Sequence, residues 1–394
     1  MDKIYDICIV GGGASGMAAA IKANRTNSDL SIVVIEKNTV LGKKLKATGN
    51  GRCNITNVNA VNYLENMKFF NYLSLLPKEE EGRIYPNSFD SGDVVSILVE
   101  KIYGLNIEII KGNAAREIHG EKDAFRIKLD DGELITRRVL LACGGKAAPI
   151  FGTTGDGYGM ARKLGHRVTR LAPVLVPIEC EGDFTGIKGI RARGILTLVK
   201  NKEIIFSETG EIQFTEYGIS GICTFNATRF MKFDENKSLD AYRMYFDFAP
   251  NVDIYEFINN KVEQSINENS REKNANILRS IVKAPMAKSI IDMAGIRGDD
   301  FLRSLKETDV RRIEGLVHEY PIIPKKIKGW KSAQCTAGGV DINDINMDTM
   351  ESKVCPGLYL SGELIDYDGP CGGYNLDNAW FTGAKAGESM AKQL

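Results

Sequence analysis

The chain has 394 residues, with 51 Lys and Arg balanced by 51 Asp and Glu, so its formal net charge is zero. This balance argues against a general polyanion binder, which needs a basic face. Its 40 glycines exceed the usual share of roughly 7% and follow no G-X-Y repeat, which indicates tight turns rather than a fibre. A chain of this size with 43% hydrophobic residues can bury a large core in more than one domain.

The eight cysteines and three histidines are too scattered for a disulfide framework or a zinc site. Even the closest two thiols, Cys355 and Cys371, form no C-x-x-C. The first residues run straight into a strand-like segment, and no apolar run approaches the roughly 20 residues of a membrane span. We therefore expect reduced thiols in a cytoplasmic protein, with no metal and no membrane partner.

A strand, a loop, a helix and a second strand open the chain in that order. Residues 5–10 form an apolar run typical of a buried parallel strand, residues 17–23 are helix-compatible, and residues 30–35 predict the next strand. Glu36 ends that strand. The order predicts a Rossmann-like βαβ unit in an α/β fold.

The loop of this unit fits G-x-G-x-x-G. Gly11 permits the turn, Gly13 lets the backbone approach a pyrophosphate, and Gly16 allows close helix–strand packing. Glu36 follows at a strand end, where a carboxylate can accept both hydroxyls of an unphosphorylated adenosine ribose, as in FAD or NAD. An ordinary glycine-rich turn is the alternative for an isolated motif of this kind.

The amino-acid composition changes twice after the first 100 residues. Short strands are predicted at 106–110, 125–129 and 138–143, whereas roughly 178–334 has a different composition, with strand-like pieces first and helical spacing after Pro250. The last 60 residues are again glycine-rich. We therefore predict a discontinuous nucleotide-binding domain, residues 1–177 and 335–394, interrupted by an inserted domain at 178–334.

Two further segments favour FAD over NAD. Residues 42–57 carry cations, hydroxyls and amides suited to a diphosphate, a ribityl chain and a flavin edge, although a solvated basic loop is the alternative. Near the C-terminus, residues 372–379 open a helix that runs toward Ala391. Its N-terminus could stabilise negative charge on the flavin pyrimidine edge, or simply cap a terminal helix.

Four motifs carry a resemblance that covers nearly the whole chain. They are Gly-Gly-Gly-Ala-Ser-Gly at 11–16, Thr-Gly-Asn-Gly-Arg-Cys-Asn-Ile-Thr-Asn at 48–57, Thr-Thr-Gly-Asp-Gly-Tyr at 153–158, and the segment 362–376 ending in Gly-Gly-Tyr-Asn-Leu. The sequence resembles the BaiN/YhiN-type, aminoacetone oxidase-like family of FAD-dependent oxidoreductases, in the two-dinucleotide-binding-domain flavoprotein superfamily. The second and fourth motifs are specific to that family, and the first is not.

The resemblance implies a glutathione-reductase-like FAD domain with an inserted domain, a β-barrel at about 178–232 and a small helical bundle at about 236–315. Asp377 and Asn378 depart from it, because a glutamine and an aromatic residue are expected there, and Cys371 replaces a threonine. These departures concern the substrate side. Residues and resemblance together give these candidates for FAD binding: Gly11, Gly13, Ala14, Ser15, Gly16, Glu36, Lys37, Lys44, Thr48, Gly49, Asn50, Gly51, Arg52, Cys53, Asn54, Ala114, Ala115, Ala142, Gly144, Gly145, Gly155, Asp156, Gly362, Glu363, Gly373, Tyr374, Asn375 and Leu376.

If FAD is bound, the flavin carries the hydride and no catalytic base is required. A disulfide reductase is excluded by the cysteine spacing, and no second G-x-G-x-x-G provides a separate NAD(P)H domain. The favoured hypothesis is NAD(P)H-dependent reduction of an activated C=C in a small organic substrate. An alternative is an oxygen-dependent amine oxidase that produces hydrogen peroxide.

A third hypothesis is an RNA-associated flavoprotein, suggested by a small basic cluster of Lys188, Arg191 and Arg193. The zero net charge favours a solvated turn instead, so no nucleic-acid partner is expected. No catalytic residue can be assigned, and the candidates for the substrate side are Tyr217, Asp366, Tyr367 and Tyr374.

Overall fold

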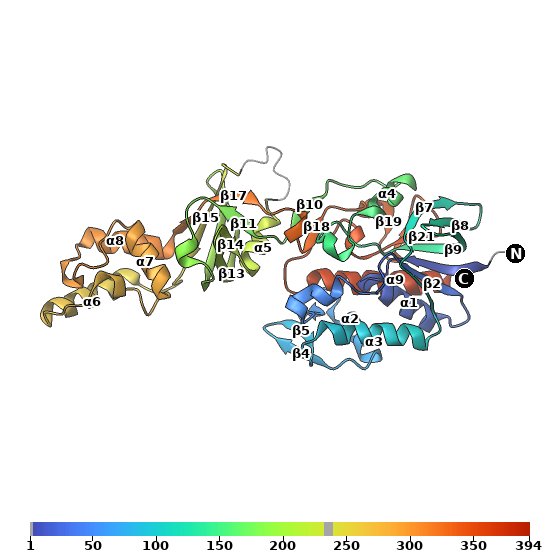
Figure 1. Cartoon of the computed structure of the whole chain (residues 1–394), viewed down its shortest axis with the longest axis horizontal. Coiled ribbons are helices and arrows are strands. Elements are labelled where there is room, and N and C mark those ends of the chain that lie inside the picture. The colour runs from blue at the N-terminus through green and yellow to red at the C-terminus, as the bar shows by residue number, and fades with distance from the viewer. Residues whose placement is uncertain (1–2, 232–238) are drawn as a thin grey trace. The chain divides into compact units, whose positions relative to one another are not determined.

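The computed structural model describes residues 3–231 and 239–394, which form two compact units. The first unit comprises Met1–Val174 and Trp330–Leu394, and the second comprises Leu175–Gly329 (Figure 1). Each unit has its own hydrophobic core.

The helices of the first unit are α1 (Ala14–Thr26), α2 (Tyr63–Tyr72), α3 (Ser91–Gly104), α4 (Asp156–Lys163) and α9 (Tyr374–Lys392). Its strands are β1 (Ile4–Val10), β2 (Ile32–Glu36), β3 (Thr56–Asn57), β4 (Pro77–Glu80), β5 (Arg83–Pro86), β6 (Glu108–Lys111), β7 (Ala115–Gly120), β8 (Phe125–Leu129), β9 (Glu133–Leu141), β10 (Ala172–Val174), β18 (Cys335–Ala337), β19 (Ile345–Asn346), β20 (Glu351–Ser352) and β21 (Leu358–Leu360).

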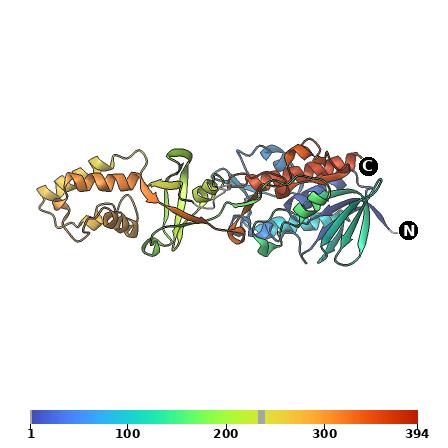
Figure 2. The ribbon, with the colours of Figure 1, turned by 90° about the horizontal axis from the view of Figure 1, so that it is seen from above.

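A parallel sheet is the centre of the first unit. Its strands run in the order β21-β9-β1-β2-β6, with Cys8 opposite Val33 on one side and opposite Val139 on the other. β1 and β2 are apolar almost throughout because helices cover the sheet and leave no polar face. This arrangement confirms the Rossmann-like fold class. β7 and β8 add an antiparallel flank to β9, visible as the teal strands in Figure 2.

The first and last helices of this unit, α1 and α9, pack closely because small residues line their contact. A Cβ at Gly383 would lie 2.1 Å from the Ser15 carbonyl oxygen, and one at Gly387 would lie 2.2 Å from that of Ala19. Only glycine permits this approach. The contact fixes the start of the C-terminal helix beside the glycine loop of the N-terminal βαβ unit.

Several predicted boundaries differ from the structure by a few residues, and two of the differences have a clear cause. α1 begins at Ala14 rather than near residue 17, since the glycine loop turns directly into the helix. The strand predicted at 138–143 is the end of a longer strand, β9, which starts at Glu133. Its polar first half pairs with β8 at the sheet surface, where alternating burial hides the apolar signal.

The second unit combines an antiparallel sheet with helices. Its strands are β11 (Ile178–Cys180), β12 (Arg191–Lys200), β13 (Glu203–Thr215), β14 (Gly218–Ser220), β15 (Tyr242–Asp247), β16 (Tyr320–Ile322) and β17 (Pro324–Ile327), and its helices are α5 (Ile222–Thr228), α6 (Ile254–Asn267), α7 (Ala284–Met293) and α8 (Glu307–His318). The sheet order is β16-β15-β12-β13-β14-β11-β17. A core that includes Phe214, Phe246 and Tyr320 joins the sheet to the helices.

Candidate functional site

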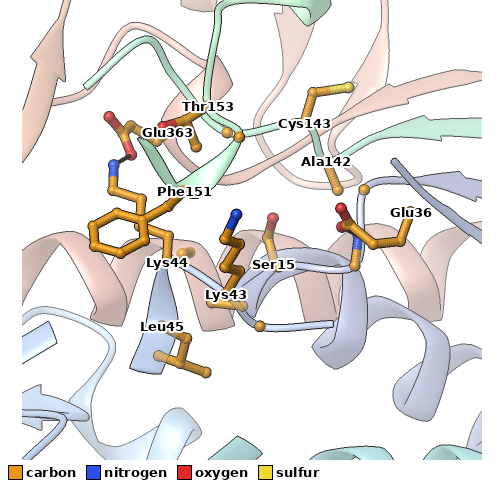
Figure 3. Close-up of a pocket in the computed structure, with 18 of the residues that line it drawn as sticks. Ser15, Glu36, Lys43, Lys44, Leu45, Ala142, Cys143, Phe151, Thr153 and Glu363 are labelled. Carbon is orange, nitrogen blue, oxygen red and sulfur yellow. Dashed lines mark hydrogen bonds and ion pairs between the residues drawn. The ribbon is translucent and has the colours of Figure 1, made fainter. Parts of the chain in front are cut away.

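A large open cavity lies at the carboxyl ends of the parallel strands of the first unit. About 1340 Å³ of space lies within and in front of it, including open solvent at its mouth (Figure 3). Open α/β sheets bind ligands at this edge because their loops converge there. The candidates from the sequence that line it are Gly11, Gly13, Ala14, Ser15, Glu36, Lys37, Lys44, Thr48, Ala114, Ala115, Ala142, Gly144, Asp156, Glu363, Asn375 and Leu376.

The three motif glycines have three different environments, which match the roles expected from the motif. Gly11 has φ +116°, and a Cβ there would lie 2.4 Å from the Ala142 carbonyl oxygen. A Cβ at Gly16 would lie 1.9 Å from the Gly11 carbonyl oxygen, so this glycine serves close packing. At Gly13, by contrast, a Cβ would meet no protein atom within 4 Å. The open space at Gly13 faces the cavity, where a diphosphate can approach the backbone.

The start of α1 is suited to an anion. Gly13 is the N-cap, no side chain caps the helix, and the first turn holds no acidic residue. The first N–H groups of a helix lack intrahelical partners and carry partial positive charge. Lys43 is exposed and lines the cavity beside Ser15 (Figure 3). Together these groups can neutralise a diphosphate.

The carboxylate of Glu36 is buried at the end of β2, with 8% of the residue exposed. Its Oε2 accepts a hydrogen bond from Gly12 N at 2.9 Å. Its Oε1 accepts two, from Asn38 N at 2.8 Å and Asn38 Nδ2 at 2.7 Å. A carboxylate has about four acceptor positions, so one is open here. The second ribose hydroxyl would need the Asn38 side-chain amide as its hydrogen-bond partner. Asn38 also lines the cavity, and the sequence motif does not indicate it.

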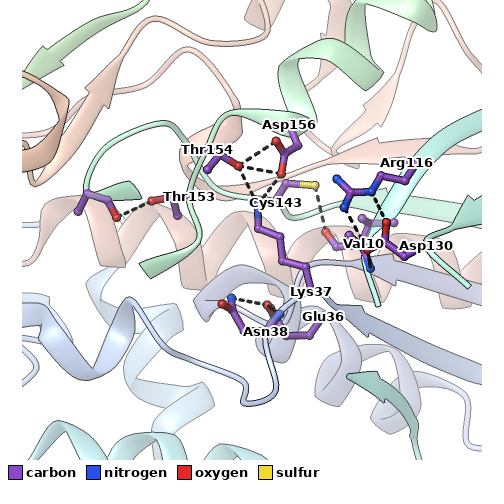
Figure 4. Close-up of polar contacts among 12 residues, drawn as sticks. Val10, Glu36, Lys37, Asn38, Arg116, Asp130, Cys143, Thr153, Thr154 and Asp156 are labelled. Atoms are coloured by element: carbon purple, nitrogen blue, oxygen red, sulfur yellow. Dashed lines mark hydrogen bonds and ion pairs between the residues drawn. The ribbon is translucent and has the colours of Figure 1, made fainter. Parts of the chain in front are cut away.

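Charged pairs surround the same end of the cavity (Figure 4). Lys37 Nζ contacts Asp156 and donates to Thr154 Oγ1 at 2.8 Å, which ties the end of β2 to the start of α4. Burial alone would raise the pKa of the Asp156 carboxyl, but hydrogen bonds from Lys37 and Thr154 hold that pKa below its usual value. Asp156 is therefore ionised, and its charge cancels that of Lys37.

The backbone of Ala114, a candidate for adenine contact, is already paired with Asp130. Ala114 N donates to Asp130 Oδ2 at 3.2 Å, and the Ala114 carbonyl accepts from Asp130 N at 3.0 Å. Arg116 in turn pairs with the same carboxylate (Figure 4). Adenine contact at this position would therefore use the second lone pair of the carbonyl or the neighbouring Ala115.

An ion pair joins distant segments at the other end of the cavity. Lys44 Nζ lies 2.6 Å from Glu363 Oε2, and both side chains are about four-fifths buried. Glu363 Oε1 accepts from Thr336 N at 2.9 Å. Gly145 makes room for this arrangement, since a Cβ there would lie 2.5 Å from Glu363 Oε1. The sequence predicted Lys44, Glu363 and Gly145 as site residues but not their contact with one another.

Two thiols line the cavity, Cys143 and Cys335. Burial raises the pKa of the Cys143 thiol to about 12, and burial also raises the pKa of Cys335 well above its usual value. Both are therefore neutral thiols near pH 7, unlike reactive cysteines, whose pKa is lowered. All eight cysteines are free.

The loop that follows Thr48 does not line the cavity. Gly49, Asn50, Gly51 and Cys53 have φ values between 55° and 82°, so this segment is a series of left-handed turns. Arg52 lies over the Tyr85 ring, 4.9 Å from its centroid. The other candidates that do not line the cavity are Gly16, Asn54, Gly145, Gly155, Gly362, Gly373 and Tyr374. A flavin contact from these residues stays a prediction.

The helix start after Gly373 does reach the cavity, through Asn375 and Leu376. Gly373 is the N-cap of α9, has φ +106°, and no side chain caps the helix. The Asn375 amide, however, holds the preceding loop: its Oδ1 accepts from Gly369 N at 2.8 Å and its Nδ2 donates to Gly369 O at 3.0 Å. This end of the cavity thus offers backbone N–H groups rather than the Asn375 side chain.

Of the four substrate-side candidates, only Tyr367 lines the cavity. Asp366 accepts from Thr169 Oγ1 at 2.8 Å, and the Tyr374 hydroxyl donates to Asn57 at 3.3 Å. Tyr217 belongs to the second unit, where the Lys328 ammonium lies 4.2 Å from its ring centroid. The cavity also has lining residues that were not among the candidates for FAD binding: Val10, Gly12, Ile35, Asn38, Gly42, Lys43, Leu45, Cys143, Phe151, Gly152, Thr153, Thr154, Met160, Gln334, Cys335, Asn378 and Ala379.

Among residues 3–231 and 239–394, no three His, Cys, Asp or Glu side chains gather closely enough to hold a metal ion. Within the same ranges, no helix has the length and apolar character that crossing a bilayer requires.

Comparison with known proteins places this fold and cavity in a family. The sequence model described as "HI0933-like protein Rossmann domain" matches residues 5–72 and 64–389. The chain belongs to the HI0933-like family. This is the BaiN/YhiN-type group that the motifs resemble, so the recognition from sequence is confirmed.

Full-length relatives of this HI0933-like chain have named activities. It is 31% identical to a 3-dehydro-bile acid delta(4,6)-reductase of Clostridium scindens, over 98% of this chain and 99% of that one. It is 24% identical to a ribosomal RNA dihydrouridine synthase of Haemophilus influenzae, over 100% of both chains. The fold is similar to 3-ketosteroid delta1-dehydrogenase from Sterolibacterium denitrificans, with a TM-score of 0.51, 14% identity, and coverage of 99% of this chain and 100% of that one.

Family membership and the flavoenzyme fold make the protein an FAD-dependent oxidoreductase. The cavity fits this cofactor on its own evidence. It combines an uncapped helix N-terminus, a glycine whose missing Cβ leaves room at the backbone, the exposed Lys43 in its lining and a buried acid at a strand end.

Proposed function

We propose that this protein uses FAD to reduce a carbon–carbon double bond conjugated to a carbonyl group, with NAD(P)H as the reductant. The observation that carries the proposal is the full-length similarity to a relative named as a bile acid delta(4,6)-reductase. In the overall reaction, a hydride from NAD(P)H, carried by FAD, would add to the β-carbon and a proton from water would add to the α-carbon, so that NAD(P)+ and the saturated product are formed.

FAD, when bound, supplies the hydride-carrying centre. The chain's own residues would bind and orient it. The start of α1, Gly13 and Lys43 would hold the diphosphate, and Glu36 with Asn38 would hold the adenosine ribose. The N-cap region of α9 would orient the ring end through backbone N–H groups.

The thiols support a direct hydride route rather than a dithiol relay. The cavity thiols Cys143 and Cys335 are neutral, and all eight cysteines are free. The sequence contains one G-x-G-x-x-G, so NAD(P)H would dock transiently against the flavin. Full-length similarity to a relative named as a reductase favours reduction over the amine-oxidase alternative.

A ribosomal RNA substrate is a second candidate, because two relatives with the dihydrouridine synthase name match 100% and 95% of this chain. Forming dihydrouridine is itself reduction of a C=C conjugated to a carbonyl, in the uracil ring. The ion pairs of the basic cluster favour a small-molecule substrate over RNA. In the basic cluster, Lys188 pairs with Glu216 at 2.5 Å and Arg191 pairs with Glu211 at 2.9 Å, which leaves little positive field for a polyanion.

The test separates the two half-reactions. The oxidised protein is mixed anaerobically with NADH, NADPH or aminoacetone, and the loss of flavin absorbance is recorded. We expect bleaching by a nicotinamide cofactor and none by the amine. Bleaching by aminoacetone alone would refute the reductase and support the oxidase.

The reduced protein is then offered three oxidants in separate anaerobic experiments: a 3-oxo-4,6-diene bile acid, cyclohexenone and a ribosomal RNA transcript. Recovery of flavin absorbance with an enone, and a product heavier by two hydrogens, supports the proposal. Recovery with RNA alone, accompanied by dihydrouridine in the digest, would replace the small-molecule substrate by RNA. Recovery of flavin absorbance with oxygen alone would exclude both the small-molecule enone and the RNA as substrates.

A further inference from the structure

A buried carboxylate without a cationic partner lies in the first turn of α9. Asp377 is 2% exposed. Its Oδ1 accepts from Thr56 Oγ1 at 2.6 Å and from Asn66 Nδ2 at 2.7 Å, and its Oδ2 accepts from Asn62 N at 3.2 Å and Asn62 Nδ2 at 3.0 Å. Among the described residues, no Lys, Arg or His forms an ion pair with it.

The direction of two of these hydrogen bonds is fixed by the neighbours. Asn66 Nδ2 also donates to the Asp377 backbone carbonyl at 2.9 Å, which sets the orientation of that amide. The Asn62 backbone N–H can only donate. Both oxygens therefore accept from neutral donors, which is the arrangement of a carboxylate anion held by hydrogen bonds.

This charge stands beside the cavity. The residues before and after it, Leu376 and Asn378, both line the cavity, whereas the Asp377 side chain is turned toward α2 and β3. The start of a helix carries partial positive charge, and a carboxylate in its first turn offsets that charge. The resemblance leads us to expect a glutamine and an aromatic residue at this pair of positions, so the Asp377 carboxylate departs from the expected pattern.

We propose that Asp377 is a positioning residue with an electrostatic effect on the cofactor. It ties Thr56 and α2 to the start of α9, and its charge lowers the reduction potential of FAD below the value that the helix start alone would give. The inference rests on the FAD site of the proposed function, but it holds for any substrate.

The sign follows from where charge develops. Reduction of a flavin places negative charge on the pyrimidine side of the ring, which the start of α9 would face in the proposed binding mode. A fixed negative charge there disfavours the reduced form, since like charges repel in the partly desolvated site. Replacement by a neutral residue therefore favours reduction, about tenfold in the equilibrium with a reference dye, or about 30 mV for a two-electron couple.

The test compares Asp377→Asn with Thr56→Val. The first variant removes the charge and keeps the size of the side chain. The second removes one hydrogen bond to Asp377 and keeps the charge, and Thr56 does not line the cavity. For each FAD-loaded protein, the flavin potential is measured against a reference dye, and the unfolding temperature of the apoprotein is measured alongside.

We expect the potential of Asp377→Asn to rise by about 30 mV, and that of Thr56→Val to stay unchanged while its unfolding temperature falls. Equal potentials in all three proteins, or equal shifts in both variants, would overturn the electrostatic role. If Asp377→Asn does not retain FAD, Asn62→Lys supplies the measurement, because it places a cation where Asn62 Nδ2 now donates to Oδ2. Its potential should also rise, and no rise would overturn the proposal. Failure of the proposed function would instead appear as reduced flavin that no enone reoxidises.

Discussion

Replacing Glu36 by Ala tests the ribose end of the cavity most directly. The carboxylate has three protein donors and one open acceptor position, so it can take one ribose hydroxyl without any rearrangement. A hydrogen bond to a charged acceptor contributes about 1.5–3 kcal/mol. Loss of about 2 kcal/mol weakens binding roughly thirtyfold, since about 1.4 kcal/mol is a factor of ten.

The assay is titration of the apoprotein with FAD, followed by the quenching of flavin fluorescence. Glu108→Ala is the matched control, because Glu108 begins the neighbouring strand β6, pairs with Lys3 at the surface and does not line the cavity. Its Kd for FAD should equal that of the unchanged protein.

Glu36→Ala also removes the acceptor for Gly12 N, so the unfolding temperature of the apoprotein must be measured in parallel. A folded Glu36→Ala protein whose Kd lies within twofold of the unchanged protein would refute the ribose role.

Three further predictions concern the same unit. Gly13→Ala should leave the unfolding temperature of the apoprotein unchanged and weaken FAD binding at least about tenfold, because a Cβ at Gly13 meets open space. Gly16→Ala should lower the free energy of unfolding by about 1–3 kcal/mol, because a Cβ there would lie 1.9 Å from a backbone oxygen. Equal effects of the two substitutions on FAD binding and on stability would contradict the assigned roles. Lys43→Met should weaken FAD binding about fivefold, with Lys46→Met, another exposed lysine outside the cavity lining, as the control that should match the unchanged protein. Burial lowers the pKa of His166, whose Nε2 has no partner, so the unfolded chain binds the proton more tightly and stability falls as pH drops through about 6.5. His166→Leu should reduce that loss in thermal unfolding between about pH 7.5 and 5.5, and an unchanged pH profile would contradict it.

The sequence by itself determined the local parts of the site. β1, the glycine loop, α1 and Glu36 follow one another within about 30 residues, so backbone conformation and side-chain type encode them directly. Gly11 is recognisable because only glycine adopts φ +116° at such a close approach. The family motifs likewise indicate a flavoprotein without any information on tertiary contacts.

Only the tertiary structure decided which motif residues face the cavity and which face each other. Thr56 and Asn57 end one family motif and do not line the cavity. They bind Asp377, which directly follows the other motif, and Gly372 within it, more than 300 residues away. Lys44 and Glu363 meet in the same way. Spacing along the chain contains no information on such pairs, because their approach depends on how α1, α9 and the parallel sheet pack together. The glycines at 383 and 387 set that packing, and so they position the start of α9 as firmly as any residue of the motif itself.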